Sequence, residues 1–179
     1  MYRCLCCGSK TLPVDPKDAI AFICPVCWWE NDVFISADDE PSDENHQLTL
    51  EQGRRNYNKC GISDPWLIIR WAENDARPWS EIIQMLCKNS SYFEIHCWED
   101  EINEINLALQ YGILKRTDWE KGSVIAGKVT SQFKNMLYHL PKPHDTEAFQ
   151  KKTPFFSIFF DNGFSSEHYG TEINYMEEN

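Results

Sequence analysis

Cysteines near the start of the chain form the pattern with the clearest chemistry. Cys4 and Cys7 enclose two residues, and after sixteen further residues Cys24 and Cys27 repeat that spacing. Two such C-x2-C pairs are typical of a structural zinc site, because each turn directs two thiolates to one side. Four thiolates complete a tetrahedral shell and leave no coordination position open for a substrate. We therefore expect a structural Zn²⁺ ion bound by Cys4, Cys7, Cys24 and Cys27.

A further cysteine, Cys6, lies inside the first pair, but pairs that use Cys6 have a poorer spacing than Cys4 with Cys7. We interpret Cys6 as a free thiol or as a residue that supports the ligands without binding the ion. The first residues show no secretory signal, and disulfides belong to oxidising compartments, so the eight cysteines do not predict a disulfide framework. The expected location is cytoplasmic.

The elements that must position these cysteines are short. Strands are expected at 11–14 and 19–23, which gives a zinc-ribbon-like β module over residues 1–35. A module this small buries little apolar surface, so the metal would supply most of its folding free energy, on the order of 10–16 kcal/mol. Trp28 and Trp29 follow the last ligand and are expected to cover the metal loop. The alternative is an aromatic platform for nucleic-acid bases, which the lack of nearby Lys or Arg disfavours.

This stretch resembles the cysteine-rich CPCC domain of bacterial proteins. The residues that carry the resemblance are Cys4-Leu5-Cys6-Cys7-Gly8, Thr11-Leu12, residues 24–32, Asn45, residues 48–50, residues 55–57 and Gly61. Leu5 stands where the family usually has Pro, and since Leu is not a ligand the metal site is unaffected. The resemblance covers residues 3–64, and it implies a small protein that acts beside a bacterial toxin–immunity system.

The rest of the chain reads as an acidic loop with a helix (36–64) and a larger domain (66–179). The helix is expected from Leu50 to Cys60, with Thr49 as N-cap and Gly61 as C-cap, and Asp64-Pro65 marks the boundary. In the larger domain, strands are expected at 66–71, 92–98, 123–129, 155–160 and 164–175, with helices starting at 79, 102 and 131. The predicted fold class is α+β, in which one mainly antiparallel sheet and about three helices follow the zinc-ribbon-like module and its helix.

No catalytic constellation is visible in the sequence. The neighbours His96 and Cys97 suggest a nucleophile and base, but successive residues of a strand point to opposite faces. Cys97 would then share the core side with Phe93 and Ile95. The sequence therefore predicts a protein that is not an enzyme.

The charge distribution favours a basic partner. The chain has 17 Lys and Arg against 28 Asp and Glu, a net charge of −11, which makes nucleic-acid binding unlikely because phosphate contacts need clustered basic residues. Residues 18–53 hold nine acids and no Lys or Arg. The candidate partner-binding residues are Asp38, Asp39, Glu40, Asp43, Glu44, Glu99, Asp100, Glu101 and Glu104. The last four could also suggest acid–base chemistry, but they stand at a helix start, where negative side chains stabilise the helix dipole.

Two functions from different classes are compatible with these features. The favoured hypothesis is a non-catalytic, acidic, zinc-binding immunity protein that occludes the basic cleft of a nuclease-type toxin, since complementary charge speeds and orients association. The alternative is a zinc ribbon that contacts nucleic acid or the transcription or translation machinery, which rests on fold analogy. No apolar run is long enough to cross a bilayer, so no membrane partner is expected.

Overall fold

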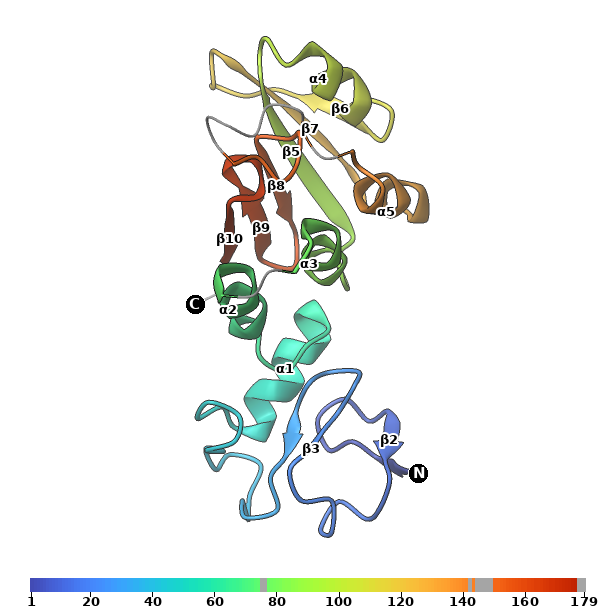
Figure 1. Cartoon of the computed structure of the whole chain (residues 1–179), viewed down its shortest axis with the longest axis vertical. Helices are drawn as coiled ribbons and strands as arrows, with labels where there is room; N and C mark the ends of the chain where they lie inside the picture. The colour runs from blue at the N-terminus through green and yellow to red at the C-terminus, as the bar shows by residue number, and fades with distance from the viewer. Residues whose placement is uncertain (75–76, 142, 144–149, 177–179) are drawn as a thin grey trace. The chain divides into compact units, whose positions relative to one another are not determined.

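The computed structural model describes residues 1–74, 77–141, 143 and 150–176 (Figure 1). The chain forms two compact units, Met1–Leu67 and Ile68–Asn179, and each is described by itself. The overall class is α+β with antiparallel strand pairing throughout the described sheets, which confirms the predicted fold class.

The N-terminal unit contains two small antiparallel hairpins. Strand β1 (Tyr2–Arg3) pairs with β2 (Lys10–Leu12), and β3 (Phe22–Ile23) pairs with β4 (Glu30–Asn31). One cysteine pair lies in the connection of each hairpin, so the structure has the zinc-ribbon-like arrangement. The strands expected at 11–14 and 19–23 are present but shorter, because two or three residues suffice to close each cysteine turn.

Helix α1 (Leu50–Cys60) has the bounds and both caps that the sequence predicts. Thr49 accepts a hydrogen bond from the Gln52 amide at 3.2 Å, and Gln52 accepts one from the Thr49 amide at 2.8 Å, which completes a capping box. At the other end, Gly61 adopts a left-handed conformation (φ 81°) that lets its amide bond to the Tyr57 carbonyl.

The C-terminal unit is built on a six-stranded sheet in the order β10-β9-β8-β5-β7-β6. The strands are β5 (Tyr92–Trp98), β6 (Gly112–Lys115), β7 (Gly122–Lys128), β8 (Ser157–Phe160), β9 (Phe164–Glu167) and β10 (Glu172–Tyr175). The helices that follow α1 are α2 (Trp66–Asn74), α3 (Trp79–Leu86), α4 (Ile102–Ala108) and α5 (Ser131–Tyr138). Helices α3 and α5 pack beside each other against the sheet (Figure 1).

Strand β5 shows why one face of this sheet is the core. Phe93, Ile95 and Cys97 are buried, whereas the alternate residues between them are only partly covered. The ring of Phe93 stacks on Phe133 of α5, with the centroids 3.7 Å apart and the planes 4° from parallel. Cys97 is therefore a buried apolar residue, as the alternation predicts.

The strand expected at 66–71 is wrong, because these residues begin helix α2. The Asp64 carboxylate accepts a hydrogen bond from the Trp66 amide at 3.0 Å, which satisfies a free donor of the first turn. Pro65 precedes the helix and needs no amide partner there. The pair Asp64-Pro65 was a helix-start signal that outweighed the strand-like apolar run.

Two further differences concern the sheet. Strand β6 was not expected, since the exposed side chains of Ile113 and Leu114 give it no alternating pattern. The single strand expected at 164–175 is divided into β9 and β10 by a 3₁₀ turn, His168–Gly170, in which His168 and Tyr169 have positive φ angles of 46° and 61°. None of the described helices has the length and apolar character needed to cross a membrane.

Candidate metal centre and acidic surfaces

The structure brings together the sulfur atoms of Cys4, Cys7, Cys24 and Cys27, all within 4.8 Å of one another. The Cys4 and Cys27 sulfurs are 3.7 Å apart, as are those of Cys7 and Cys24. A tetrahedral site with metal–sulfur bonds of about 2.3 Å has sulfur–sulfur edges of about 3.8 Å. The four cysteines therefore have the geometry to hold a metal ion.

The two cysteine turns have the same backbone structure. The amide of Gly8 bonds to the Cys4 carbonyl at 2.9 Å, and the amide of Trp28 bonds to the Cys24 carbonyl at 2.8 Å. Both of these donors adopt a left-handed conformation, with φ of 72° for Gly8 and 65° for Trp28. The repeated spacing in the sequence thus produces two equivalent turns, which is the arrangement that presents two pairs of sulfurs to one ion.

Burial and mutual contact keep most of these thiols protonated in the absence of a cation. A hydrogen bond with Cys27, together with burial, raises the pKa of Cys4. Cys24 differs: although burial opposes its ionisation, hydrogen bonds from Thr11 and from backbone amides lower its pKa to about 7. A divalent ion can displace the remaining protons, because metal binding requires the thiolate form.

The residues around the sulfurs form the core of the N-terminal unit. Buried Cys6 lies in this cluster but outside the group of four mutually close sulfurs. Trp29 is 1% exposed and packs on α1, where a side chain at Gly53 would meet its ring at 2.8 Å. The expected packing role of Trp29 is confirmed, and a ring buried to this degree cannot stack on a nucleic-acid base.

The first acidic region, residues 36–47, is folded around buried polar side chains. Ser42 donates to the Asp32 carboxylate at 2.8 Å, and Asn45 donates to Ser42 at 2.8 Å. The Asn45 amide group also bonds to the backbone of Glu30 in both directions, at 2.9 Å each. These bonds fix the loop backbone to the second hairpin and leave the loop carboxylates to the solvent.

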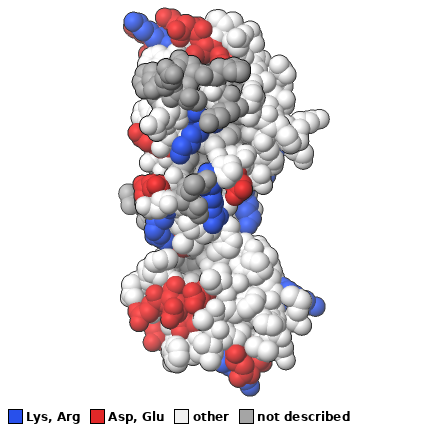
Figure 2. Space-filling view, in the orientation of Figure 1, with Lys and Arg blue, Asp and Glu red and all other residues white. Residues whose placement is uncertain are grey.

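The five candidate acids of this loop are all exposed, but they are not equivalent. Asp38 forms an ion pair with Arg54, which also donates to the Leu5 carbonyl at 3.0 Å. Glu40 accepts a bond from the Ser36 amide at 2.6 Å. Asp38 and Glu40 therefore hold the loop itself. Asp43 also accepts a hydrogen bond from the Gln47 side chain at 2.6 Å, and together with Asp39 and Glu44 it carries the remaining exposed charge. Figure 2 shows Asp and Glu side chains gathered on one area of the N-terminal unit.

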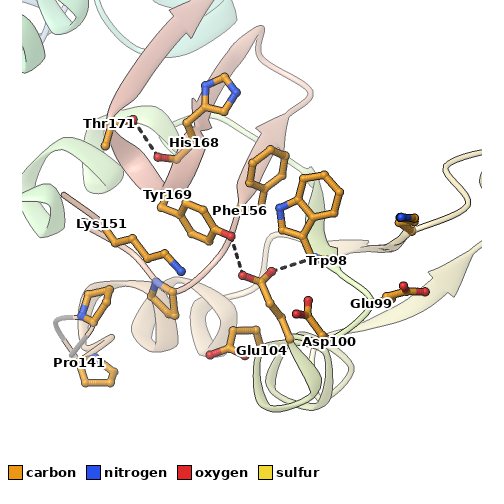
Figure 3. Close-up of a pocket in the computed structure, with 14 residues that line it drawn as sticks. Trp98, Glu99, Asp100, Glu104, Pro141, Lys151, Phe156, His168, Tyr169 and Thr171 are labelled. Atoms are coloured by element: carbon orange, nitrogen blue, oxygen red, sulfur yellow. Dashed lines mark hydrogen bonds between the residues drawn. The ribbon is translucent and has the colours of Figure 1, made fainter. Parts of the chain in front are cut away.

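The second acidic region lies at the start of α4 in the C-terminal unit. Its four acids, Glu99, Asp100, Glu101 and Glu104, line a cleft of about 950 Å³ (Figure 3). Glu101 accepts hydrogen bonds from the Trp98 amide and the Tyr169 hydroxyl, both at 2.8 Å. Glu101 is thus held inside the unit, whereas Glu99 and Asp100 are exposed. The sequence did not indicate that Trp98 and Tyr169 would share this cleft.

Within the described residues, the tetra-cysteine group is the one cluster of metal-ligating side chains with the geometry for an ion. The chain is thus an α+β protein with a tetra-cysteine centre in its N-terminal unit. Residues 2–77 match the family model for the cysteine-rich CPCC domain, which confirms the expected resemblance and extends it into α2. The comparisons with curated proteins and with solved structures gave no match.

Proposed function

We propose that this protein is a zinc-stabilised binding protein that docks an acidic surface on a basic partner protein. The observation that carries the proposal is the loop at 36–47, whose carboxylates point outward from a backbone fixed by buried hydrogen bonds. A surface that is ordered before binding loses less entropy on association. Its negative charge would steer and orient a positively charged partner.

Zinc is the metal that fits this role. Four sulfur ligands in a tetrahedron suit Zn²⁺ or iron, and a redox-inactive ion suffices for a centre that organises a fold. The buried cluster around the sulfurs consists of Cys4, Cys6, Cys24, Cys27, Trp29 and Leu50. Since most of these residues are cysteines, the ion rather than apolar burial would supply the folding free energy.

The partner class that we favour is a nuclease-type toxin, which would make this chain its immunity protein. A nuclease must present positive charge to phosphate groups, and an acidic protein seated on that charge would exclude the substrate. The match of residues 2–77 to the CPCC domain supports this choice through the association with toxin–immunity systems that the resemblance implies. No catalytic step is assigned to the chain.

The test is an affinity measurement against the purified product of the neighbouring reading frame. The triple variant Asp39→Asn, Asp43→Asn, Glu44→Gln spares Asp38 and Glu40, which hold the loop backbone. Its affinity at low salt should fall by more than about tenfold, mainly through a slower association rate.

The matched control carries the same charge change away from the loop, as Asp18→Asn, Glu73→Gln, Asp118→Asn. It should retain most of the affinity. If both variants lose the same affinity, the loop contributes only net charge. If the loop variant keeps its affinity, the loop is not part of the binding surface.

A further inference from the structure

The cleft of the C-terminal unit combines two groups that attract organic cations, namely aromatic faces and carboxylates (Figure 3). Its aromatic side chains are in contact in a row. The ring centroids of Trp98 and Phe156 are 5.1 Å apart, and those of Phe156 and Tyr169 are 5.4 Å apart. The cleft therefore has a continuous aromatic wall, contributed by β5, the segment before β8 and the turn before β10.

One carboxylate fixes this wall. Glu101 accepts from the backbone amide of Trp98 with one oxygen and from the hydroxyl of Tyr169 with the other, each at 2.8 Å. Each of its oxygens accepts one of these bonds, so Glu101 positions the Tyr169 ring. The wall is ordered before anything binds.

Three other carboxylates line the same cleft: Glu99, Asp100 and Glu104. Within the described residues, none of these three side chains forms an ion pair or a side-chain hydrogen bond. Among the residues that the structure describes, Lys121 and Lys151 also line the cleft and offset part of the charge. The negative charge beside the aromatic wall is thus available to a cation.

The chain itself shows how a cation sits there. The Lys151 ammonium lies over the Tyr169 ring, 3.8 Å from its centroid, in the geometry of a cation–π contact (Figure 3). We propose that this cleft receives a lysine or arginine side chain of the basic partner protein, and that the incoming cation takes the place of Lys151. This inference rests on the proposed function, and it names the cleft of the C-terminal unit as the site that binds one cationic side chain of the partner.

The experiment uses the full-length protein and a fluorescent lysine-rich peptide, with its fully N-acetylated form as the uncharged control. The charged peptide should bind and the acetylated peptide should not. Phe156→Leu removes the aromatic ring that packs beside Tyr169, with a small loss of volume, and it should weaken binding severalfold. Glu104→Gln should weaken binding by a severalfold factor that shrinks as salt is added.

The decisive variant is Lys151→Met, which removes the resident cation and should tighten peptide binding severalfold. Lys121→Met is its matched control, because it makes the same charge change in the same cleft without vacating the Tyr169 ring. If both variants bind the peptide more tightly by the same factor, the proposal that the incoming cation replaces Lys151 over the Tyr169 ring is overturned. A purely structural role for Lys151 would not produce tighter binding.

Further outcomes separate this proposal from the preceding one. If the Asp39, Asp43, Glu44 triple variant loses the peptide and the cleft variants do not, the cleft proposal fails and the acidic loop remains the binding surface. If single-stranded DNA binds the cleft in place of the peptide, the proposal also fails. Absence of peptide binding overturns the cleft proposal, and the measurement with the neighbouring gene product then decides the proposed function on its own.

Discussion

Cysteine is buried in both units, but in different surroundings. In the N-terminal unit, four sulfurs lie within 4.8 Å of one another, so they can share one ion; the pKa of Cys24 is lowered to about 7, whereas the pKa values of Cys4, Cys7 and Cys27 are raised. In the C-terminal unit, Cys97 lies among apolar side chains, and burial raises its pKa to about 12. The first setting suits a metal ligand and the second an inert core residue. The same residue type therefore points to an ion-dependent core in one unit and an apolar core in the other.

The largest expected effect is the unfolding of the N-terminal unit when its metal ion is lost. Chelation of the ion, or Cys24→Ser, should unfold the N-terminal unit, because an ion of this kind contributes on the order of 10 kcal/mol. Hydrogen exchange should show lost amide protection in residues 1–67 and retained protection in the sheet of the C-terminal unit. Cys6→Ser is the control and should keep the metal. If the amide protection of residues 1–67 is unchanged after chelation, the core of the N-terminal unit does not depend on a metal ion.

The matching substitution in the apolar core of the C-terminal unit is Phe133→Ala. Phe133 is fully buried and stacks on Phe93, so its loss should lower the free energy of unfolding of the C-terminal unit by about 3–5 kcal/mol. Denaturant unfolding followed by circular dichroism measures this loss, and metal content should stay at the wild-type level. A loss below about 1 kcal/mol would show that the core does not depend on this stack.

Much of this contrast is local in the sequence, which is why it could be predicted. Each C-x2-C pair and each cap of α1 involves residues a few positions apart, and the second pair repeats the spacing of the first. Helix α2 could have been found by the same kind of signal in Asp64-Pro65, but the apolar run from Trp66 also fits a buried strand. Periodicity over so few residues does not separate a helix from a strand.

The cleft could not be predicted in this way, because it depends on pairings between distant segments. Glu101 and Tyr169 are 68 residues apart in the chain, yet they share a hydrogen bond. Sequence alone placed the acids of 99–104 at a helix start, which is where they lie. It did not show that the turn at His168–Gly170 would bring an aromatic ring against them.

A smaller effect is expected from a substitution in the contact between Trp29 and helix α1. Gly53→Ala gains about 1 kcal/mol of helix propensity, but its new methyl group would meet the buried Trp29 ring at 2.8 Å. Overpacking of this kind costs about 1–3 kcal/mol, so we expect a net loss of stability in the metal-loaded protein. Gly8→Ala is the comparison: it has open space but a φ of 72°, so it should lose about 1 kcal/mol through backbone strain alone. Thermal melting with the metal bound measures both, and a gain in stability for Gly53→Ala would contradict the packing.

The smallest effect concerns His96 in the C-terminal unit. Burial lowers the pKa of His96, although nearby Glu94 opposes the shift. Above about pH 6.5 the imidazole is neutral in both the folded and the unfolded chain, so it contributes no pH dependence. Below that pH the unfolded chain takes up the proton first, and the stability of the unit should fall.

The variant His96→Gln should lose this part of the acid sensitivity. The measurement is the denaturant midpoint of the C-terminal unit at about pH 7.5 and about pH 5.5. The wild type should lose more stability between the two pH values than the variant. An equal loss would mean that other groups set the acid sensitivity.

The zinc site at Cys4, Cys7, Cys24 and Cys27 is tested most directly by elemental analysis combined with native mass spectrometry of the full-length protein purified without added metal. We expect one zinc ion per chain, a ratio that falls in Cys24→Ser and persists in Cys6→Ser. A protein without stoichiometric metal, or one in which Cys4, Cys7, Cys24 and Cys27 are joined in disulfides, would contradict this expectation.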